Sequence, residues 1–138
     1  MSSLYAESSA VLAWLLGESG ASEVVRRINE ADTVVTSVLT LLEIERAMIR
    51  AERQSLLTPG ECQKLRGMFA RAAGCWILME VSEDVRAGAG RVFPVEPVRT
   101  LDALHLATAL LFMQAFPDLQ MLTFDQRVDA NSRALGIG

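Results

Sequence analysis

The chain has 138 residues with a hydrophobic fraction of 51%, which is enough for one domain with a substantial core. Its formal net charge of −4 excludes a global positive field that would attract nucleic acid, so any such binding must use a local patch. Two cysteines without CxxC spacing and a single histidine nearly exclude a Cys/His zinc site, and we interpret Cys62 and Cys75 as small buried hydrophobes in a reducing compartment.

The first half of the chain is expected to alternate short strands with helices. No basic segment followed by a long apolar run opens it, so we expect no signal peptide, no membrane association and a cytoplasmic location. The first helix is expected to have Ser8 or Ser9 as its N-cap and to end at Gly17, and a later helix starts at Ser37 or Thr40. The strands expected in this half are 3–6 and 33–36, and the helices are 8–16, 20–29 and 37–51.

The second half continues the alternation and opens with a strong helix start. Thr58 is a capping residue, Pro59 takes the first helical position, and Glu61 follows three residues after the cap. This helix is expected to run to Ala73, where Gly74 stops it. The later strands are expected at 75–81 and 119–124, and the flanking helices at 82–92 and 126–135.

A central helix is expected between these last two strands. From Ala103 to Pro117 there is no Asp, Glu, Lys or Arg, so the helix is apolar almost all round and should be buried. It is shorter than the ~20 apolar residues that a membrane span needs. Thr100 is the expected N-cap, which places Asp102 in the first turn, where the helix dipole favours an anion.

The order of elements predicts an α/β fold with a parallel sheet covered on both faces. Ligands of such sheets bind beyond the carboxyl ends of the strands. Four acids fall directly after a strand or early in a following helix: Glu7, Glu43, Asp102 and Asp125. Converging carboxylates repel one another, and Mg²⁺ or Mn²⁺ with oxygen ligands would relieve that repulsion. The sequence shows no Ser–His–acid triad, no phosphate-binding glycine motif and no DxD pair of the kind expected of a phosphatase.

Four segments resemble, in order and spacing, the acidic motifs of PIN-domain ribonucleases, and the third is close to that of the VapC toxin branch. They are 4–12, 43–47, 99–109 and 122–128, and the segment 134–136 is similar to the family's chain end. The third and fourth motifs are the specific ones. The resemblance implies one PIN-like domain over residues 1–138, a three-layer α/β/α arrangement with a central, mostly parallel sheet of four to five strands.

The resemblance also implies a function. It points to a Mg²⁺- or Mn²⁺-dependent endoribonuclease that hydrolyses RNA phosphodiester bonds and is the toxin of a type II toxin–antitoxin pair. Such a protein would be a homodimer silenced by a cognate antitoxin protein. By motif match, the catalytic and metal-binding carboxylates would be Glu7, Glu43, Asp102 and Asp125, with Ser9 and Thr123 as supporting hydroxyls.

Glu7 departs from the family pattern, in which the first acid is nearly always aspartate. Glutamate keeps the charge but adds a methylene, whereas sites of this kind tolerate only about 0.5 Å of misplacement. Two hypotheses follow: an active nuclease, and a catalytically weakened PIN-like module that binds RNA or a partner protein.

The best candidates for RNA contact are Arg46, Arg50 and Arg53, which recur at helical spacing from Glu43. They would contact RNA phosphates near the acidic residues. Alternatively, they belong to a solvated helix face on which neighbouring glutamates (Glu45 and Glu52) pair with them.

Two further residues also have two interpretations. His105, one turn after Asp102, either orients that carboxylate or shuttles a proton, or it is a packed and hydrogen-bonded core residue. Asp129, one turn after Asp125, is either an additional outer acid of the site or a surface residue of the last helix.

Overall fold

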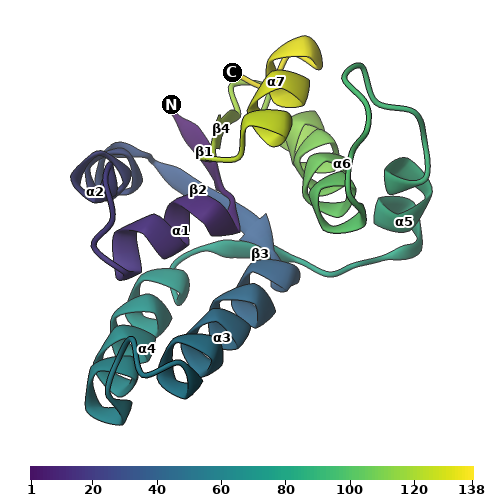
Figure 1. Cartoon of the computed structure of the whole chain (residues 1–138). Coiled ribbons are helices and arrows are strands. Elements are labelled where there is room, and N and C mark those ends of the chain that lie inside the picture. Colours follow the sequence, from purple (N-terminus) through teal and green to yellow (C-terminus); the bar gives the residue numbers. More distant parts are fainter.

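The computed structural model describes all residues, 1–138, and is built around a four-stranded parallel sheet (Figure 1). The strands are β1 Ser3–Ala6, β2 Thr33–Ser37, β3 Ile77–Met79 and β4 Gln120–Leu122. Their order in the sheet is β3-β2-β1-β4, and every neighbouring pair is parallel. The carboxyl ends of all the strands therefore lie at one edge of the sheet.

Seven helices connect and cover the strands. They are α1 Ser8–Leu15, α2 Ala21–Glu30, α3 Val38–Arg53, α4 Pro59–Ala73, α5 Glu83–Ala89, α6 Thr100–Ala115 and α7 Gln126–Ala134. None of them combines the length and the apolar character that crossing a membrane requires.

The two faces of the sheet carry separate cores because successive strand side chains point to opposite sides. From β1, Tyr5 joins one cluster with residues of α6 and α7, whereas Leu4 and Ala6 join clusters formed with α1, α2, α3 and α4. On β2, Val35 packs on the first side and Val34 on the second. Helices thus lie on both sides of the sheet, and the expected three-layer α/β/α architecture is confirmed (Figure 1).

Helix α6 is the buried central helix that the uncharged run predicts, with its residues from Ala103 to Ala109 buried except Leu104. The predicted cap is wrong, because Arg99 is the N-cap and makes no side-chain capping bond. Thr100 is instead the first helical residue, and a side chain caps an N-terminus from the extended residue that precedes the helix. Asp102 does lie in the first turn, as expected.

Strand β3 is shorter than the expected strand at 75–81 and forms one edge of the sheet. Cys75 lies in the turn after α4, where its N–H donates to the carbonyl of Ala72, and the residue is exposed. The expectation that both cysteines are buried is therefore wrong for Cys75 and confirmed for Cys62. Helix α5 likewise ends at Ala89, before the expected Val92.

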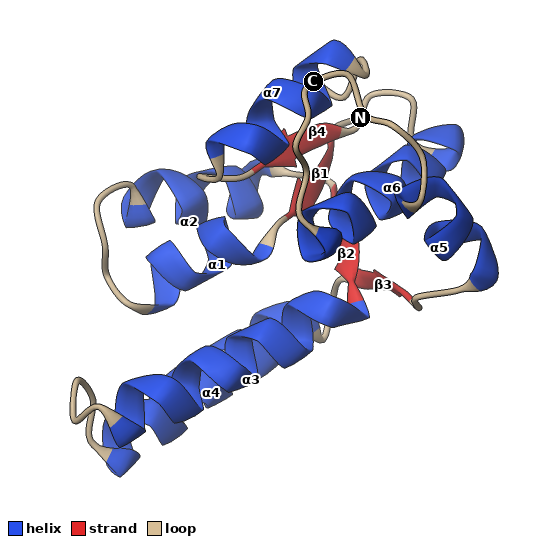
Figure 2. Ribbon diagram, turned by 45° about the vertical axis from the view of Figure 1, so that its right-hand side comes forward, coloured by secondary structure: helices blue, strands red, loops and turns tan.

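Helices α3 and α4 form an antiparallel hairpin that projects from the rest of the domain (Figure 2). At its far end the capping box is confirmed, because Thr58 Oγ1 accepts from the Glu61 N–H and the Glu61 carboxylate accepts from the Thr58 N–H. Ser37 is the N-cap of α3, one of the two starts expected there.

Candidate functional site

Three elements bring acidic residues to the carboxyl edge of the sheet. Glu7 directly follows β1, and its N–H continues the pairing with β4 by donating to the carbonyl of Leu122 at 3.0 Å. Asp125 lies three residues beyond β4, and Glu43 lies on α3, which begins directly after β2. These positions agree with the rule that parallel strands present their ligand-binding residues at this edge.

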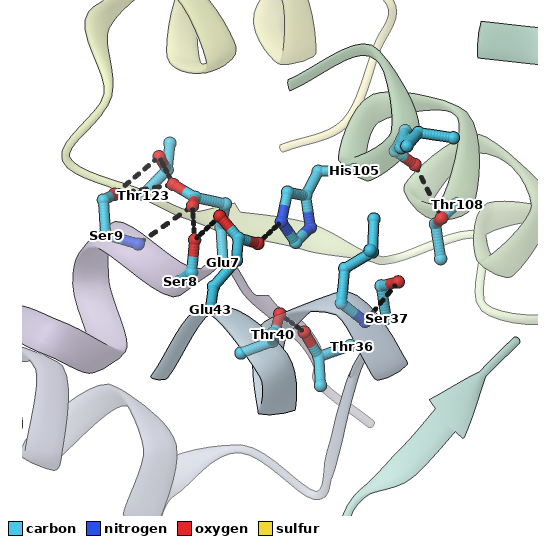
Figure 3. A network of polar contacts seen from close by, with 12 residues as sticks. Glu7, Ser8, Ser9, Thr36, Ser37, Thr40, Glu43, His105, Thr108 and Thr123 are labelled. Atoms are coloured by element: carbon cyan, nitrogen blue, oxygen red, sulfur yellow. Dashed lines mark hydrogen bonds and ion pairs between the residues drawn. The ribbon is translucent and has the colours of Figure 1, made fainter. Parts of the chain in front are cut away.

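Glu7 itself caps helix α1, where the sequence favours Ser8 or Ser9. Its Oε2 accepts from the Ser9 N–H at 2.9 Å and from Ser8 Oγ at 2.6 Å. Its Oε1 accepts from Ser9 Oγ at 2.6 Å and from Thr123 Oγ1 (Figure 3). The prediction of a serine cap is wrong because the Glu7 carboxylate itself accepts the Ser9 N–H in the first turn of α1.

The carboxylate of Glu7 is held ionised by these donors. The side chain is buried, with only 3% of the residue exposed, and burial alone would raise its pKa. Hydrogen bonds from Ser8, Ser9 and Thr123 outweigh burial, so the net pKa of Glu7 is lowered. The predicted supporting hydroxyls, Ser9 and Thr123, therefore do contact one of the acids.

Two hydroxyls connect Glu7 to the other acidic positions. Ser8 Oγ lies 2.6 Å from Glu7 Oε2 and 3.1 Å from Glu43 Oε2. On the opposite side, Thr123 Oγ1 donates to Glu7 and accepts from the Asp125 N–H at 3.0 Å. Residues from the β1–α1 junction, α3 and the segment after β4 thus belong to one hydrogen-bonded cluster, and Figure 3 shows its side chains from Glu7, Ser8, Ser9, Glu43 and Thr123. Ser8, which is expected only as a helix cap, is also a member of this cluster.

Asp102 and Asp125 line the same surface cavity, whose volume is about 620 Å³. Asp125 Oδ1 caps α7 by accepting from the Val128 N–H at 2.9 Å, whereas the Asp102 carboxylate accepts no hydrogen bond from the protein. Burial, followed by the charges of Asp125 and Glu7, raises the pKa of Asp102. Arg99, Arg127 and Phe124 are further lining residues of this cavity.

The donor chemistry of this edge suits a hard divalent cation, because all four acids offer carboxylate oxygens. Burial and the charges of Asp125 and Glu7 disfavour the ionised form of Asp102, and a bound cation would favour it. In the side-chain conformations of the structure, however, no three His, Cys, Asp or Glu side chains form a group that could hold a metal ion. The oxygens of Glu7 and Glu43 are taken by hydrogen bonds, which leaves Asp102 as the carboxylate without a donor. The assignment of the four acids as metal ligands stays a prediction.

His105 is a buried, hydrogen-bonded core residue, as one interpretation expects, with 1% of the residue exposed. Its contact is with Glu43 and not with Asp102: Nε2 lies 2.6 Å from Glu43 Oε1. Nδ1 lies 2.7 Å from the hydroxyl of Tyr5. The sequence offers a partial signal for this network, since a tyrosine in a buried strand and a histidine in an apolar helix each need a polar partner.

The three candidate RNA-binding arginines, Arg46, Arg50 and Arg53, are exposed on α3 and form no ion pair. The pairing expected with Glu45 and Glu52 is not found, and Glu45 instead pairs with Arg66 of α4 at 3.0 Å. The alternative of a solvated helix face stays open. With a helical rise of 1.5 Å per residue, Arg53 lies about 15 Å along the helix from Glu43. Contact with RNA stays a prediction for all three.

Asp129 is a surface residue of α7. It pairs with Arg133 one turn later, at 2.9 Å, and has a side chain that is 43% exposed. The surface interpretation therefore describes it, and it provides a natural control for the acids of the site.

Comparison with known proteins agrees with this arrangement. The PIN domain profile matches residues 4–133. Ribonuclease VapC46 of Mycobacterium tuberculosis is 32% identical over 138 residues, which covers 99% of this chain and 95% of the relative. Ribonuclease VapC45 of the same species is 26% identical over 133 residues, covering 96% of this chain and 91% of the relative.

Solved structures share the fold at lower identity. A toxin–antitoxin complex from Klebsiella pneumoniae superposes with a TM-score of 0.64 at 17% identity, covering 94% of this chain and 91% of the other. The sarcin-ricin loop cleaving toxin VapC20 of Mycobacterium tuberculosis gives a TM-score of 0.61 at 16% identity, covering 92% and 93%. With its sequence matched along almost its full length and its sheet order and acidic edge in place, the chain belongs to the PIN domain family, in the VapC branch.

Proposed function

We propose that the chain is a Mg²⁺- or Mn²⁺-dependent endoribonuclease and the toxin of a toxin–antitoxin pair. The observation that supports this proposal is the placement of the four acids at one edge of the sheet: Ser8 Oγ lies 2.6 Å from Glu7 and 3.1 Å from Glu43, and Asp102 and Asp125 line one cavity. Asp102 is the half-buried carboxylate among them that accepts no hydrogen bond, and an uncompensated carboxylate of this kind is typical of functional sites. The VapC relatives support RNA as the substrate.

Asp102 and Asp125 would hold the ion, because both line the cavity and one of them has no protein donor. Glu7 and Glu43 complete the predicted ligand set. When bound, the metal supplies an activated water and neutralises the charge that develops on the phosphodiester. Arg99 and Arg127 line the same cavity and would orient an RNA phosphate there.

The chain's own residues also limit how the site can move. The bonds that Ser8, Ser9 and Thr123 make to Glu7 fix the start of α1 against the end of β4. Preorganisation of this kind is what a catalytic edge needs, since loosely held groups lose activity steeply with misplacement.

A second function is favoured by one observation: both oxygens of the Glu7 carboxylate already accept hydrogen bonds from the protein. Four donors contact its two oxygens, so a direct bond from Glu7 to a metal would require some of these hydrogen bonds to break. This supports the alternative of a weakened nuclease that binds RNA or a partner protein. The Glu7→Asp variant separates the two: a strong gain of cleavage from a silent parent supports the binding module.

The decisive experiment compares Asp102→Asn with Asp129→Asn in RNA cleavage with Mn²⁺ or Mg²⁺. Both variants remove one negative charge, but Asp129 pairs with Arg133 on the surface. We expect Asp102→Asn to lower the cleavage rate by about 100-fold or more, comparable with the loss of a transition-state-stabilising group, and Asp129→Asn to cleave like the parent. Equal rates in all three proteins, or cleavage that persists in a chelator, would refute the proposal.

The partner proposals follow from the family. We propose that a cognate antitoxin protein silences the chain and that the chain forms a homodimer. Co-expression with the protein encoded beside it, followed by pull-down and light scattering, tests both; a monomer that captures nothing from such co-expression would contradict them.

A further inference from the structure

His105 is the one histidine of the chain, and both of its ring nitrogens are bonded inside the protein. It projects from α6 toward Glu43 of α3, as Figure 3 shows, and contacts Tyr5 of β1 on its other side. The Tyr5 and His105 rings meet edge to face, with centroids 5.9 Å apart and planes at 86°. Three elements far apart in the sequence therefore meet at this imidazole.

The direction of each hydrogen bond follows from the groups involved. A carboxylate only accepts, so the 2.6 Å contact with Glu43 Oε1 requires a proton on His105 Nε2. In the neutral ring Nδ1 is then an acceptor, and the Tyr5 hydroxyl donates to it at 2.7 Å. The acceptor-only carboxylate of Glu43 thus requires the Nε2–H tautomer, and the Tyr5 hydroxyl, which can donate to Nδ1, satisfies the other ring nitrogen in that state.

Apart from His105, the one protein group that can donate to Glu43 is the Ser8 hydroxyl, and Glu7 competes for its proton. The second oxygen of Glu43 lies 3.1 Å from Ser8 Oγ, but that hydroxyl has a single proton and lies closer, at 2.6 Å, to Glu7. The side chain of Glu43 is 25% exposed, so without a donor it would be free to turn into solvent. The histidine N–H is therefore what keeps this carboxylate at the acidic edge.

We propose that His105 is a positioning residue for Glu43, with the Tyr5 hydroxyl holding the imidazole in place through its second ring nitrogen. This inference rests on the proposed function for its catalytic consequence, but its structural part, the relay from Tyr5 through His105 to Glu43, stands without it. Partners that orient site ligands in this way are worth about 10- to 100-fold in metal affinity or activity when they are removed.

The test pairs His105→Leu, which has no donor, with His105→Gln, whose amide keeps an N–H near the position of Nε2. We expect His105→Leu to lower kcat for RNA and the affinity for Mn²⁺ by about 10- to 100-fold, with KM for RNA unchanged within about twofold. His105→Gln restores most of both. In a double-mutant cycle, His105→Leu adds little to Glu43→Gln because the two act through one group.

Calorimetric Mn²⁺ titration reads the positioning role independently of cleavage. If the parent protein does not cleave RNA but His105→Leu still loses Mn²⁺ affinity, the proposed function fails and the positioning role stands. Unchanged kcat and Mn²⁺ affinity in a folded His105→Leu protein, or losses that add fully to those of Glu43→Gln, overturn the inference.

A spectroscopic test needs no folded histidine variant. Because the chain has one histidine, its imidazole ¹⁵N signals in a labelled protein need no assignment. We expect the Nε2–H tautomer in the parent and in Asp129→Asn, and a shifted Nε2–H proton in Glu43→Gln. An Nδ1–H tautomer in the parent would overturn the relay.

Discussion

Neutralising two of the predicted metal-binding acids is expected to change stability in opposite directions. In Glu7→Gln the buried network loses a charge that accepts four hydrogen bonds, from Ser8 Oγ, the N–H and Oγ of Ser9, and Thr123 Oγ1. In Asp102→Asn the protein loses a half-buried charge that accepts none, that burial disfavours and that two neighbouring carboxylates repel. We therefore expect Glu7→Gln to be less stable than the parent and Asp102→Asn to be more stable in the absence of metal.

The loss in free energy of unfolding that is expected for Glu7→Gln can be worked out from the four hydrogen bonds to the carboxylate. The amide oxygen can keep the Ser9 N–H and Ser8, but these bonds lose their charge assistance, worth about 1 kcal/mol each. The amide NH₂ then faces Ser9 Oγ and Thr123 Oγ1, which already accept from the N–H groups of Phe124 and Asp125. The total loss is about 2–4 kcal/mol, allowing for rearrangement, and a domain of this size loses about 3 °C of melting temperature per kcal/mol. The expected drop is about 6–12 °C.

The pH dependence of this difference gives a second check. Because the folded pKa of Glu7 is lowered, its contribution is present above the ordinary glutamate pKa of about 4.3 and is lost as the pH falls through the lowered value. The gap between parent and Glu7→Gln should therefore be constant near neutrality and close in acid. Asp102 has a raised pKa, so its ionisation lowers the stability of the folded parent as the pH rises through that value. The stability of Asp102→Asn relative to the parent should therefore be greatest near neutrality.

Thermal unfolding followed by circular dichroism, without metal and at several pH values, measures both effects. Asp129→Asn is the control for charge alone. A Glu7→Gln protein as stable as the parent would refute the reasoning that the carboxylate is a structural cap. A destabilised Asp102→Asn would refute the claim that burial and neighbouring carboxylates disfavour the Asp102 charge.

Three further predictions concern other parts of the molecule. Gly20→Ala should lower the free energy of unfolding by more than about 1 kcal/mol, because Gly20 has φ of +89° and a Cβ there would lie 2.8 Å from the Phe124 ring. Denaturant titration measures this loss, and an unchanged unfolding midpoint would contradict it. Replacing Arg46, Arg50 and Arg53 together by Gln should weaken RNA binding and flatten its dependence on salt, with the slope falling by about 0.7 for each phosphate that is no longer neutralised; an unaltered slope in filter binding would assign these side chains to a solvated face. Adding Mn²⁺ at about 100 times its dissociation constant should stabilise the parent by about 2.7 kcal/mol, and scanning calorimetry that finds no such shift would argue against the metal site.

The parallel sheet and the gathering of acids could be predicted because both depend on local signals and one topological rule. Alternating strands and helices make the sheet parallel. A parallel sheet brings the residues after Ala6 and Leu122 to one edge, independently of the conformation of the loops. The capping box at Thr58 is likewise local, since all its atoms lie within four residues.

What the sequence could not show depends on contacts between distant segments. Whether Glu7 reaches outward or folds back depends on donors from Thr123, 116 positions away. The choice of Glu43 over Asp102 as the partner of His105 depends on how α3 and α6 meet across the end of the sheet, and their side chains are 62 positions apart. Helical spacing favoured Asp102 because it counts only neighbours along one helix.

Glu7 is both the cap of α1 and a predicted residue of the active site, and this affects how the protein should be studied in living cells. A substitution there is expected to reduce the amount of folded protein as well as any catalysis, and a few kcal/mol can change cellular abundance several-fold. Loss of a growth phenotype in a position-7 allele would therefore not separate proteolytic turnover from an impaired active centre. An allele at Asp102, which is expected to accumulate at least as well as the parent, is the better inactive reference for such genetics.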